Sequence, residues 1–246
     1  MDSLEKQNCI FGTNFLEKFV GKSILHNPKI AIIELVANAW DAGAKNVNII
    51  WPTNDNEQFF SIEDDGEGLT EEEFSSRWRT FGYDRIITQG MTVLVNDKQR
   101  TVFGRNGIGR FAGFCFGESY FVNSTKNRLT IEYEVSESAG ETPFKLQKLN
   151  NFKNNDKTGT RIFVRSKSSL SIKDDAIRAE IGMRFLTDPL FSCFVNGEKV
   201  SFSDIPEANI ADKIISLESG QSITVKIIDT VDSDKTTKQH GIAWHV

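Results

Sequence analysis

The sequence contains few cysteines, and their placement excludes two common classes of protein. The three cysteines, Cys9, Cys115 and Cys193, are odd in number and widely spaced, so they form neither a disulfide framework nor a cluster of metal ligands. A chain without a disulfide framework is typical of a reducing compartment, and the sequence therefore predicts a cytoplasmic protein.

The sequence also lacks an excess of positive charge and any long apolar run. Lys and Arg number 29 against 34 Asp and Glu, so the net charge of −5 creates no overall field that attracts nucleic acid or an anionic membrane. No apolar run approaches the roughly 20 residues of a membrane span. The stretch MDSLEKQNCIFG lacks the basic and apolar regions of a signal peptide. No membrane partner is expected, and nucleic acid is expected to be contacted only through regions outside this chain.

Enough apolar residues are present to build a sizeable core. They make up 39% of the 246 residues, a length that suits one large domain or two small ones. Alternation with a period of two predicts strands at NVNIIW, QFFSIED, SYFVNS, RLTIEYEV, FKLQKL, GTRIFVRS, KIISLES and SITVKIIDTV. The dipeptide Asn196-Gly197 predicts a tight hairpin within SCFVNGEKVSF.

Helices are predicted at four further places. The first covers residues 14–20, and the second covers the segment NPKIAIIELVANAWDAGAKNV, which begins with an Asn-Pro start signal. A third follows a capping box made by Thr70 and Glu73 and is expected to stop at Gly82, and a fourth covers DDAIRAEIGMRFL. The stretch Tyr83 to Phe103 shows no clear periodicity and is predicted to be a long loop.

The second of these helices is apolar nearly all the way round, yet it keeps Glu34, Asn38 and Asp41. At about 100° per residue these three side chains fall within an arc of roughly 60°. A narrow solvated face is one interpretation, but such faces are usually wider and carry Lys or Arg. A polar stripe that faces an internal cleft fits the sequence better.

Four short elements carry the chemistry. They are Glu34-x-x-x-Asn38-x-x-Asp41-Ala42, the stretch DDGEG that contains Asp64, the stretch GRNGIGR that is expected to open a helix near Ile108, and Gly159-Thr160. Each is weak alone: DDGEG is usually an acidic turn, and GRNGIGR is neither a Walker A loop nor a dinucleotide fingerprint. Their combination in this order is far more specific.

Together these elements resemble the GHKL superfamily, which includes DNA gyrase B, the heat-shock-ninety chaperones, histidine kinases, and the MutL and MORC proteins. ELVANAWDAGAKNVNI is similar to the helix and strand of the MutL and chaperone branches, and GRNGIGRFA to the phosphate loop of MORC-like ATPases. The resemblance implies an α+β fold of the Bergerat type, a two-layer α/β sandwich with a mixed, mostly antiparallel sheet covered by helices on one face. It also implies ATP and Mg²⁺ as cofactors.

The resemblance assigns a role to each matching residue. Asp64 would accept a hydrogen bond from the adenine amine, with Thr160 holding a shared water. The neighbours of the base would be Gly66, Gly68 and Leu69. Asn38 would bind magnesium, and Asp41 would hold ordered waters or, in the alternative interpretation, bond the turn around Gly43. The phosphates would meet Gly104, Gly107, Ile108, Gly109 and Arg110, where backbone N–H groups face the ligand; Arg105 is a further candidate, and both arginines could equally be surface residues.

Glu34 lies one turn before Asn38, so its carboxylate is expected beside the γ-phosphate, where it can orient and deprotonate a water. Histidine kinases have no matching need for this glutamate, and none of His26, His240 and His245 lies in a recognisable dimerisation helix. Hydrolysis is therefore the favoured activity, with an ATP- or ADP-binding switch of negligible turnover as the alternative.

The predicted domain covers residues 1–200, with a lid over residues 83–110. Residues 201–246 are expected to form terminal strands of the same domain or the start of a following one, and the chain is expected to be the N-terminal piece of something longer. The resemblance further implies an ATP-dependent homodimer and leaves DNA repair, compaction, defence against foreign DNA, or client proteins open as biological contexts.

Overall fold

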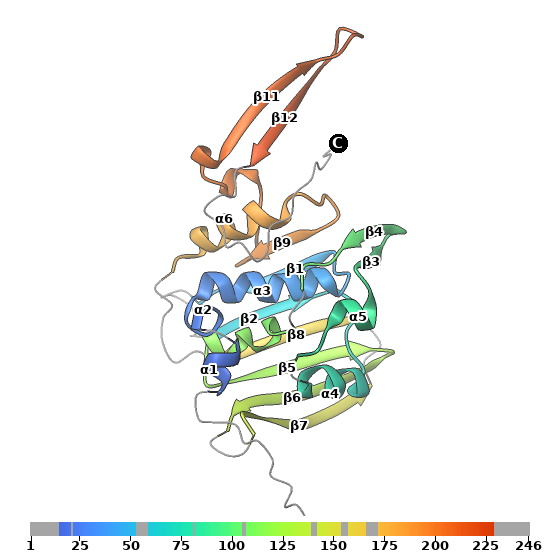
Figure 1. Cartoon of the computed structure of the whole chain (residues 1–246), viewed down its shortest axis with the longest axis vertical. Helices are drawn as coiled ribbons and strands as arrows, with labels where there is room; N and C mark the ends of the chain where they lie inside the picture. The colour runs from blue at the N-terminus through green and yellow to red at the C-terminus, as the bar shows by residue number, and fades with distance from the viewer. Residues whose placement is uncertain are drawn as a thin grey trace, which may run out of the picture.

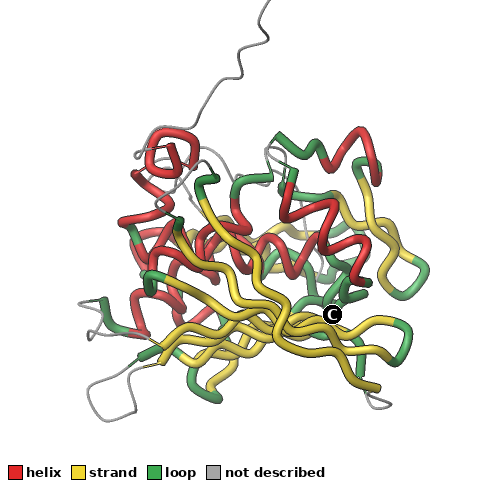
Figure 2. The backbone as a smooth tube through the Cα atoms, turned by 90° about the horizontal axis from the view of Figure 1, so that it is seen from below, coloured by secondary structure: helices red, strands yellow, loops and turns green. Residues whose placement is uncertain are grey.

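A single eight-stranded sheet forms one layer of the molecule, and helices cover one of its faces (Figures 1 and 2). The computed structural model describes residues 15–20, 22–52, 59–80, 82–104, 107–138, 142–153, 157–165 and 172–228. In sheet order the strands are β10 (Glu198–Lys199), β9 (Ser192–Val195), β1 (Asn46–Ile50), β2 (Phe59–Asp64), β8 (Gly159–Arg165), β5 (Ser119–Lys126), β6 (Leu129–Glu137) and β7 (Phe144–Lys153). Only β1 and β9 pair in parallel within this sheet. The predicted mixed, mostly antiparallel α+β fold is confirmed.

The helices of the described chain are α1 (Phe15–Val20), α2 (Lys22–His26), α3 (Pro28–Asp41), α4 (Glu71–Arg79), α5 (Arg85–Gln89) and α6 (Asp174–Phe185). Short 3₁₀ helices add η1 (Gly109–Cys115), η2 (Phe202–Asp204) and η3 (Glu207–Asn209). None of the helices in this part of the chain is long and apolar enough to span a membrane.

Helix α3 lies along the sheet and carries much of the core. Its start is fixed by Asn27, whose side chain accepts a hydrogen bond of 3.0 Å from the backbone N–H of Lys29, with Pro28 in the first turn as predicted. The chain leaves the helix through Gly43, whose φ of +74° suits glycine. Trp40 packs near its end against the rings of Phe103, Phe185 and Phe191.

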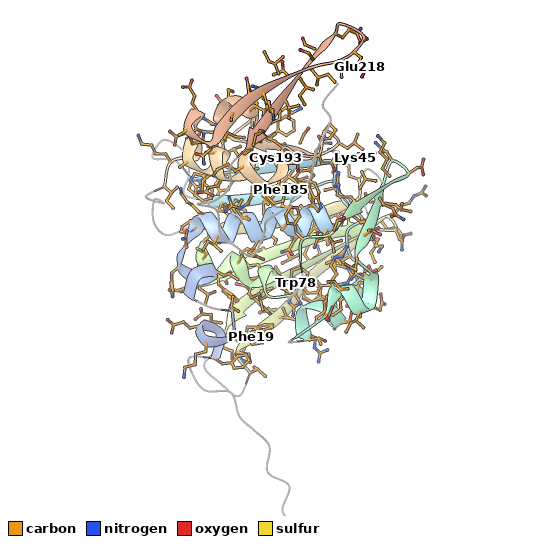
Figure 3. The ribbon with its side chains drawn as sticks, turned by 45° about the horizontal axis from the view of Figure 1, so that its top comes forward. Phe19, Lys45, Trp78, Phe185, Cys193 and Glu218 are labelled. Carbon is orange, nitrogen blue, oxygen red and sulfur yellow. The ribbon has the colours of Figure 1, made fainter. Side chains whose placement is uncertain are left out.

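The predicted capping box of α4 is confirmed, but its predicted end is wrong. The Thr70 side chain accepts from the backbone N–H of Glu73, and the Glu73 carboxylate accepts from the backbone N–H of Thr70. The helix stops at Arg79 because Thr80 is already extended, with ψ of 105°, before Gly82 is reached. Phe74 and Trp78 turn inward from this helix, and Trp78 is seen at the interior of Figure 3.

The predicted long loop from Tyr83 to Phe103 is also wrong. It contains α5 and a two-stranded hairpin, β3 (Thr92–Val95) and β4 (Lys98–Thr101), joined by Asn96 and Asp97 in the left-handed region. The alternation in TVLV and the Asn-Asp turn do indicate a hairpin. The signal is weak because the two strands are short. The hairpin is also fastened to the core: the Trp40 indole donates to the Thr101 carbonyl at 2.8 Å, and Arg100 pairs with Asp188 at 2.8 Å.

Where a helix was expected from Ile108, the chain forms the 3₁₀ helix η1 instead. Its sequence contains Gly109 and Gly113, and glycine weakens an α-helix by about 1 kcal/mol per residue. A Cβ at position 113 would lie 2.6 Å from the Tyr120 ring, so this turn is tightened against β5. The element therefore packs closely but is short and irregular.

Residues beyond the main sheet form a second, two-stranded sheet of β11 (Ile210–Ser216) and β12 (Ser222–Ile228), which projects from the rest of the molecule (Figure 1). Its turn carries Glu218, far from Phe185 and Cys193 in the body (Figure 3). Both predicted strands are present, although β11 begins and ends three residues before the predicted KIISLES, and they do not join the eight-stranded sheet. Whether they begin another domain stays a prediction, and residues 229–246 and the N-terminal residues 1–14 lie outside the described residues.

Candidate functional site

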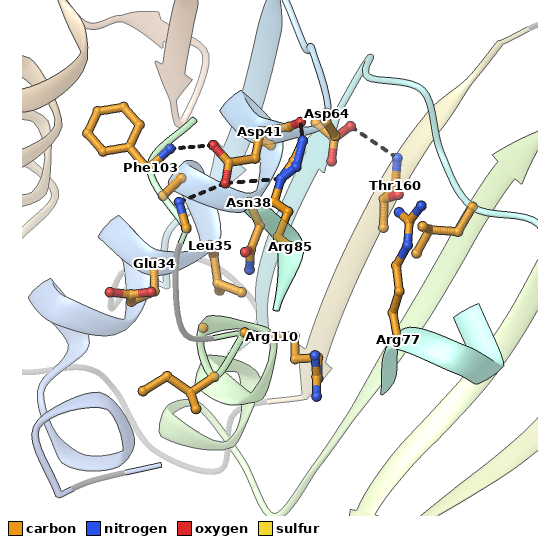
Figure 4. Close-up of a pocket in the computed structure, with 18 of the residues that line it drawn as sticks. Glu34, Leu35, Asn38, Asp41, Asp64, Arg77, Arg85, Phe103, Arg110 and Thr160 are labelled. Carbon is orange, nitrogen blue, oxygen red and sulfur yellow. Dashed lines mark hydrogen bonds and ion pairs between the residues drawn. The ribbon is translucent and has the colours of Figure 1, made fainter. Parts of the chain in front are cut away.

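A cavity of about 900 Å³ opens between α3, the ends of β2 and β8, α4, α5 and the turn into η1 (Figure 4). It falls at the upper part of the usual size range of ligand pockets, about 300–1,000 Å³. The predicted site residues that line it are Glu34, Asn38, Asp41, Asp64, Gly68, Leu69, Gly104, Gly107, Ile108, Gly109, Arg110 and Thr160. Gly66 was also predicted but does not line this cavity. Arg105 lies outside the described residues.

Two polar side chains open from the buried helix α3 into this cavity. From Ala31 to Asp41 the helix is buried except at Glu34, which is half-buried, and Asn38, which is exposed. They are four residues apart, so they lie on the same face one turn from each other. The polar stripe of this helix therefore faces the cavity. The alternative interpretation, a narrow face on the outside of the molecule, is wrong.

Asp64 occupies the opposite wall, at the end of β2. Its Oδ1 accepts hydrogen bonds from the backbone N–H of Gly66 at 2.8 Å and of Thr160 at 3.3 Å. Burial raises the pKa of this carboxyl to about 7, the two N–H donors oppose the rise, and the charges of Asp65 and Glu63 add to it. A carboxyl with one oxygen engaged by the backbone and the other available is suited to accept from an amine donor.

Ser124 of β5 was not predicted and joins the surroundings of Asp64. Its hydroxyl accepts from the backbone N–H of Leu69 at 2.8 Å and lies 2.8 Å from the Thr160 hydroxyl. It is fully buried. Because β5 and β8 pair with Ser124 opposite Thr160, only the sheet register brings this residue to the site. A single serine in a strand pattern gives no signal in the sequence.

The glycines of the site stand where backbone or carboxylate oxygens come too close for a side chain. A Cβ at Gly109 would lie 2.5 Å from Glu34 Oε2, and one at Gly104 would lie 2.8 Å from Asp41 Oδ2. At Gly107, with φ of +61°, a Cβ would meet the carbonyl oxygen of Tyr83 at 2.5 Å. The glycine-rich turn is thereby pressed against the polar face of α3.

Gly66 and Gly68 each lie close to the backbone of a neighbouring element. A Cβ at Gly66 would lie 2.7 Å from the Ala42 carbonyl oxygen, so Gly66 fits against the end of α3 and does not line the cavity as predicted. A Cβ at Gly68 would lie 2.0 Å from the carbonyl oxygen of Thr125. These contacts hold the Asp64 turn between α3 and β5.

Asp41 makes a set of contacts that neither predicted role describes. Its Oδ1 accepts from the backbone N–H of Phe103 at 2.7 Å, and its Oδ2 accepts from that of Gly104 at 2.8 Å. Burial raises the pKa of this carboxyl, against the effect of these donors and of Arg85. The side chain thus fastens the end of the 83–104 segment to α3, and its role with ordered water stays a prediction.

Arg110 is buried, so the surface alternative considered for it is wrong. Its guanidinium donates to the Thr80 carbonyl at 2.6 Å and stacks over the Phe111 ring at 4.8 Å. Burial lowers its pKa to about 10, which leaves it charged at neutral pH. Two further arginines, Arg77 of α4 and Arg85 of α5, line the cavity and were not predicted. Arg85 lies in the segment read as a loop.

The described residues contain no group of three or more His, Cys, Asp or Glu side chains that could hold a metal ion. A magnesium ion does not need such a group of side chains. It keeps several waters and is usually held by one or two protein oxygens plus substrate phosphates. The exposed amide of Asn38 in the cavity provides one such oxygen. The residues therefore fit a magnesium ion that arrives with a polyphosphate.

The fold is a helix-covered, mostly antiparallel sheet with a cavity of ligand size beside its central strands. Residues 26–160, more than half of the chain, match the family described as "Histidine kinase-, DNA gyrase B-, and HSP90-like ATPase", and the chain belongs to this family. The resemblance to the GHKL superfamily is thus confirmed. The matched range holds the whole set of motifs from Glu34 to Thr160.

One relative is similar to this chain over a longer stretch than the family match. The protein named "Putative type II restriction enzyme HgiDII" from Herpetosiphon aurantiacus is 26% identical over 183 residues, which cover 70% of this chain and 29% of the relative. The chain thus spans less than a third of that protein's length.

Proposed function

We propose that the chain is the ATPase part of a larger protein, in which magnesium-dependent binding and hydrolysis of ATP drive a conformational change or the pairing of two such domains. The supporting observation is that one cavity joins Asp64 and Thr160 at one end to Asn38 and Glu34 at the other. The first pair suits a base with an amine donor, and the second suits a metal-bound phosphate.

At the base end, the ionised carboxylate of Asp64 accepts from the exocyclic amine of adenine, which guanine does not offer at that position. Thr160 lies beside it through its backbone bond to Asp64 Oδ1. The leucine at position 69 supplies an apolar wall, since it is buried and lines the cavity. This arrangement would give selectivity for ATP and ADP over guanine nucleotides.

At the phosphate end, the backbone N–H groups near Gly107 and Gly109 meet the phosphates. Magnesium, when bound, neutralises part of the phosphate charge, and Asn38 supplies its protein ligand. Glu34 orients a water for attack on the γ-phosphate and accepts its proton. The packing of Gly109 on the Glu34 carboxylate limits where that carboxylate can lie.

One observation favours the second candidate, a switch that binds ATP or ADP with negligible turnover. The described cations of the cavity are each engaged by protein groups: Arg77 by Glu73 at 3.4 Å, Arg85 by Asp41 at 3.6 Å, and Arg110 by the Thr80 carbonyl. Hydrolysis needs positive charge at the γ-phosphate. That charge would have to come from a rearranged arginine or from outside this chain.

The cellular role follows from analogy. The relative is named as a restriction enzyme, and the MutL and MORC branches also suggest work on DNA, so defence against foreign DNA in the cytoplasm is the role we infer. Contact with DNA is assigned to regions outside this chain because the net charge here is −5. Pairing of two copies through this domain is part of the same proposal.

The test is calorimetric titration with ATP and magnesium, together with an assay of phosphate release. Wild type is expected to bind one ATP per chain, and Asp64→Asn is expected to abolish binding, while Glu72→Gln, at an exposed carboxylate of α4 that does not line the cavity, leaves it intact. Glu34→Ala is expected to keep binding and lose phosphate release. Binding without release in wild type would select the switch, and no binding by the folded wild type would refute both candidates.

A further inference from the structure

Arg85 places a positive charge in the middle of the cavity. It is the first residue of α5, its side chain is 15% exposed, and its Nε lies 3.6 Å from Asp41 Oδ2. One of its terminal nitrogens donates to the backbone carbonyl of Asp41. Figure 4 shows the guanidinium beside Asp41, and Arg85, Asn38 and Asp64 all line the same cavity. A nucleotide that fills this cavity therefore lies in a space that Arg85 shares.

The Asp41 carboxylate does not depend on Arg85 for its hydrogen bonds. Both of its oxygens already accept from backbone N–H groups, of Phe103 and of Gly104, at 2.7 and 2.8 Å. The ion pair with Arg85 is longer, at 3.6 Å. Withdrawal of the guanidinium would leave the Asp41 carboxylate with its two backbone donors. Arg85 would exchange its contacts with Asp41 for contacts with phosphate oxygens, so a ligand has to be present for the exchange.

The other two described arginines of the cavity have partners of their own. Arg110 is buried at 6% exposure, donates to the Thr80 carbonyl at 2.6 Å and stacks on Phe111. Arg77 is held on its own helix by Glu73, a residue that also takes part in the capping box of α4. A guanidinium offers five donors in a fork that matches two phosphate oxygens. Each nitrogen of the Arg85 guanidinium has one partner, Asp41 for two of them and Gln89 Oε1 at 3.2 Å for the third, so the two terminal nitrogens each keep one further N–H donor.

The element that carries Arg85 is short and lies between two glycines. Gly82 and Gly90 have φ of +69° and +86°, and neither has a neighbouring atom within 4 Å of a would-be Cβ. Ile87 on the same helix is 82% exposed, so apolar packing holds α5 only weakly. By contrast, the following hairpin is fastened to α3 by Trp40 and to Asp188 by Arg100. Of the described residues of this segment, those of α5 are therefore the least firmly held.

We propose that Arg85 recognises the phosphate chain of the nucleotide together with the backbone N–H groups near Gly107 and Gly109, and that it leaves Asp41 for phosphate oxygens when the cavity is filled. The inference rests on the proposed ATP site and deepens it. Arg85 then distinguishes nucleotides by their phosphates, while Asp64 distinguishes them by their base. Its exchange of partners also links occupancy of the cavity to the position of α5.

The experiment compares wild type, Arg85→Ala, Arg85→Lys and the control Arg79→Ala by calorimetric titration with ATP and magnesium and, separately, with adenosine. Arg79 is an exposed arginine of α4 outside the cavity. Loss of a charge-assisted contact predicts that Arg85→Ala weakens ATP binding by about tenfold to hundredfold. Adenosine binding is expected to be unchanged, which also shows that the variant is folded, and Arg85→Lys should recover part of the ATP affinity.

The outcomes separate this inference from the proposed function. ATP binding that is unchanged in Arg85→Ala would overturn the inference and leave the proposed function standing. An equal loss of ATP and adenosine affinity would show that Arg85 acts on the shape of the cavity and would also overturn it. Failure of wild type itself to bind ATP would overturn the proposed function, and the role of Arg85 with it.

Discussion

Replacing Asp64 by asparagine is expected to stabilise the unliganded protein while it removes nucleotide binding. Burial raises the pKa of this carboxyl from 3.8 to about 7, which means that the fold disfavours the ionised form. Both N–H donors, from Gly66 and Thr160, bond to Oδ1, so an asparagine oxygen can replace that atom without losing them. The substitution removes the charge and keeps the shape.

The magnitude follows from proton linkage. Because the folded pKa is raised, the folded state binds the proton more tightly than the unfolded state, and this contribution to stability is full below pH 3.8 and lost as the pH rises to about 7. The interval between pH 5 and the folded pKa is about two pH units, and each unit lowers the unfolding free energy by about 1.4 kcal/mol. The wild-type protein should therefore lose roughly 3 kcal/mol of unfolding free energy through Asp64 between pH 5 and pH 8.

The assay is urea unfolding of wild type and Asp64→Asn at pH 5 and at pH 8. The difference in unfolding free energy between the two proteins should favour the variant by roughly 3 kcal/mol more at pH 8 than at pH 5, since other titrating groups cancel in the comparison. A difference that does not change with pH would refute the claim that the fold raises the pKa of Asp64. A variant that is less stable at both values would show that the second carboxylate oxygen has a structural role.

Three further predictions concern the same cavity. If an adenine amine donates to ionised Asp64, binding of ATP at pH 7 should release roughly half a proton, seen as a binding enthalpy that differs between phosphate and Tris buffers. Asn38→Ala should remove the magnesium dependence of ATP binding, because the substitution takes away the protein oxygen offered to the metal. Gly109→Ala should lower phosphate release by about a hundredfold with ATP binding largely kept, because a Cβ there would lie 2.5 Å from Glu34 Oε2.

Each of these has a contrary result. Equal enthalpies in the two buffers would mean that Asp64 does not change protonation on binding. Magnesium dependence that persists in Asn38→Ala would place the metal ligand elsewhere. Full phosphate release by Gly109→Ala would show that the position of the Glu34 carboxylate is not what the glycine protects.

The sequence alone determined the family, the fold class and the residues to examine. The helix from Pro28 to Asp41 is specified locally by its Asn-Pro start, its apolar run and the glycine after its end, and the motif spacings at Glu34, Asp64 and Thr160 identify the family. The helix signals depend on residues a few positions apart, and the motifs identify the family through their combination and order along the chain. The chemical roles given to the site residues stay predictions that the experiments above test.

Tertiary structure decided what lies around those residues. Ser124 reaches the site only because β5 pairs with β8 in one register, and Asp41 meets Phe103 only because the chain returns to α3 after 62 residues. Arg85 joins the cavity through a short helix whose five residues carry too little periodicity to be predicted. Contacts between distant segments depend on how sheet and helix pack, and no local pattern encodes them, so the sequence identifies the chemistry while the packing determines which side chains hold it in place.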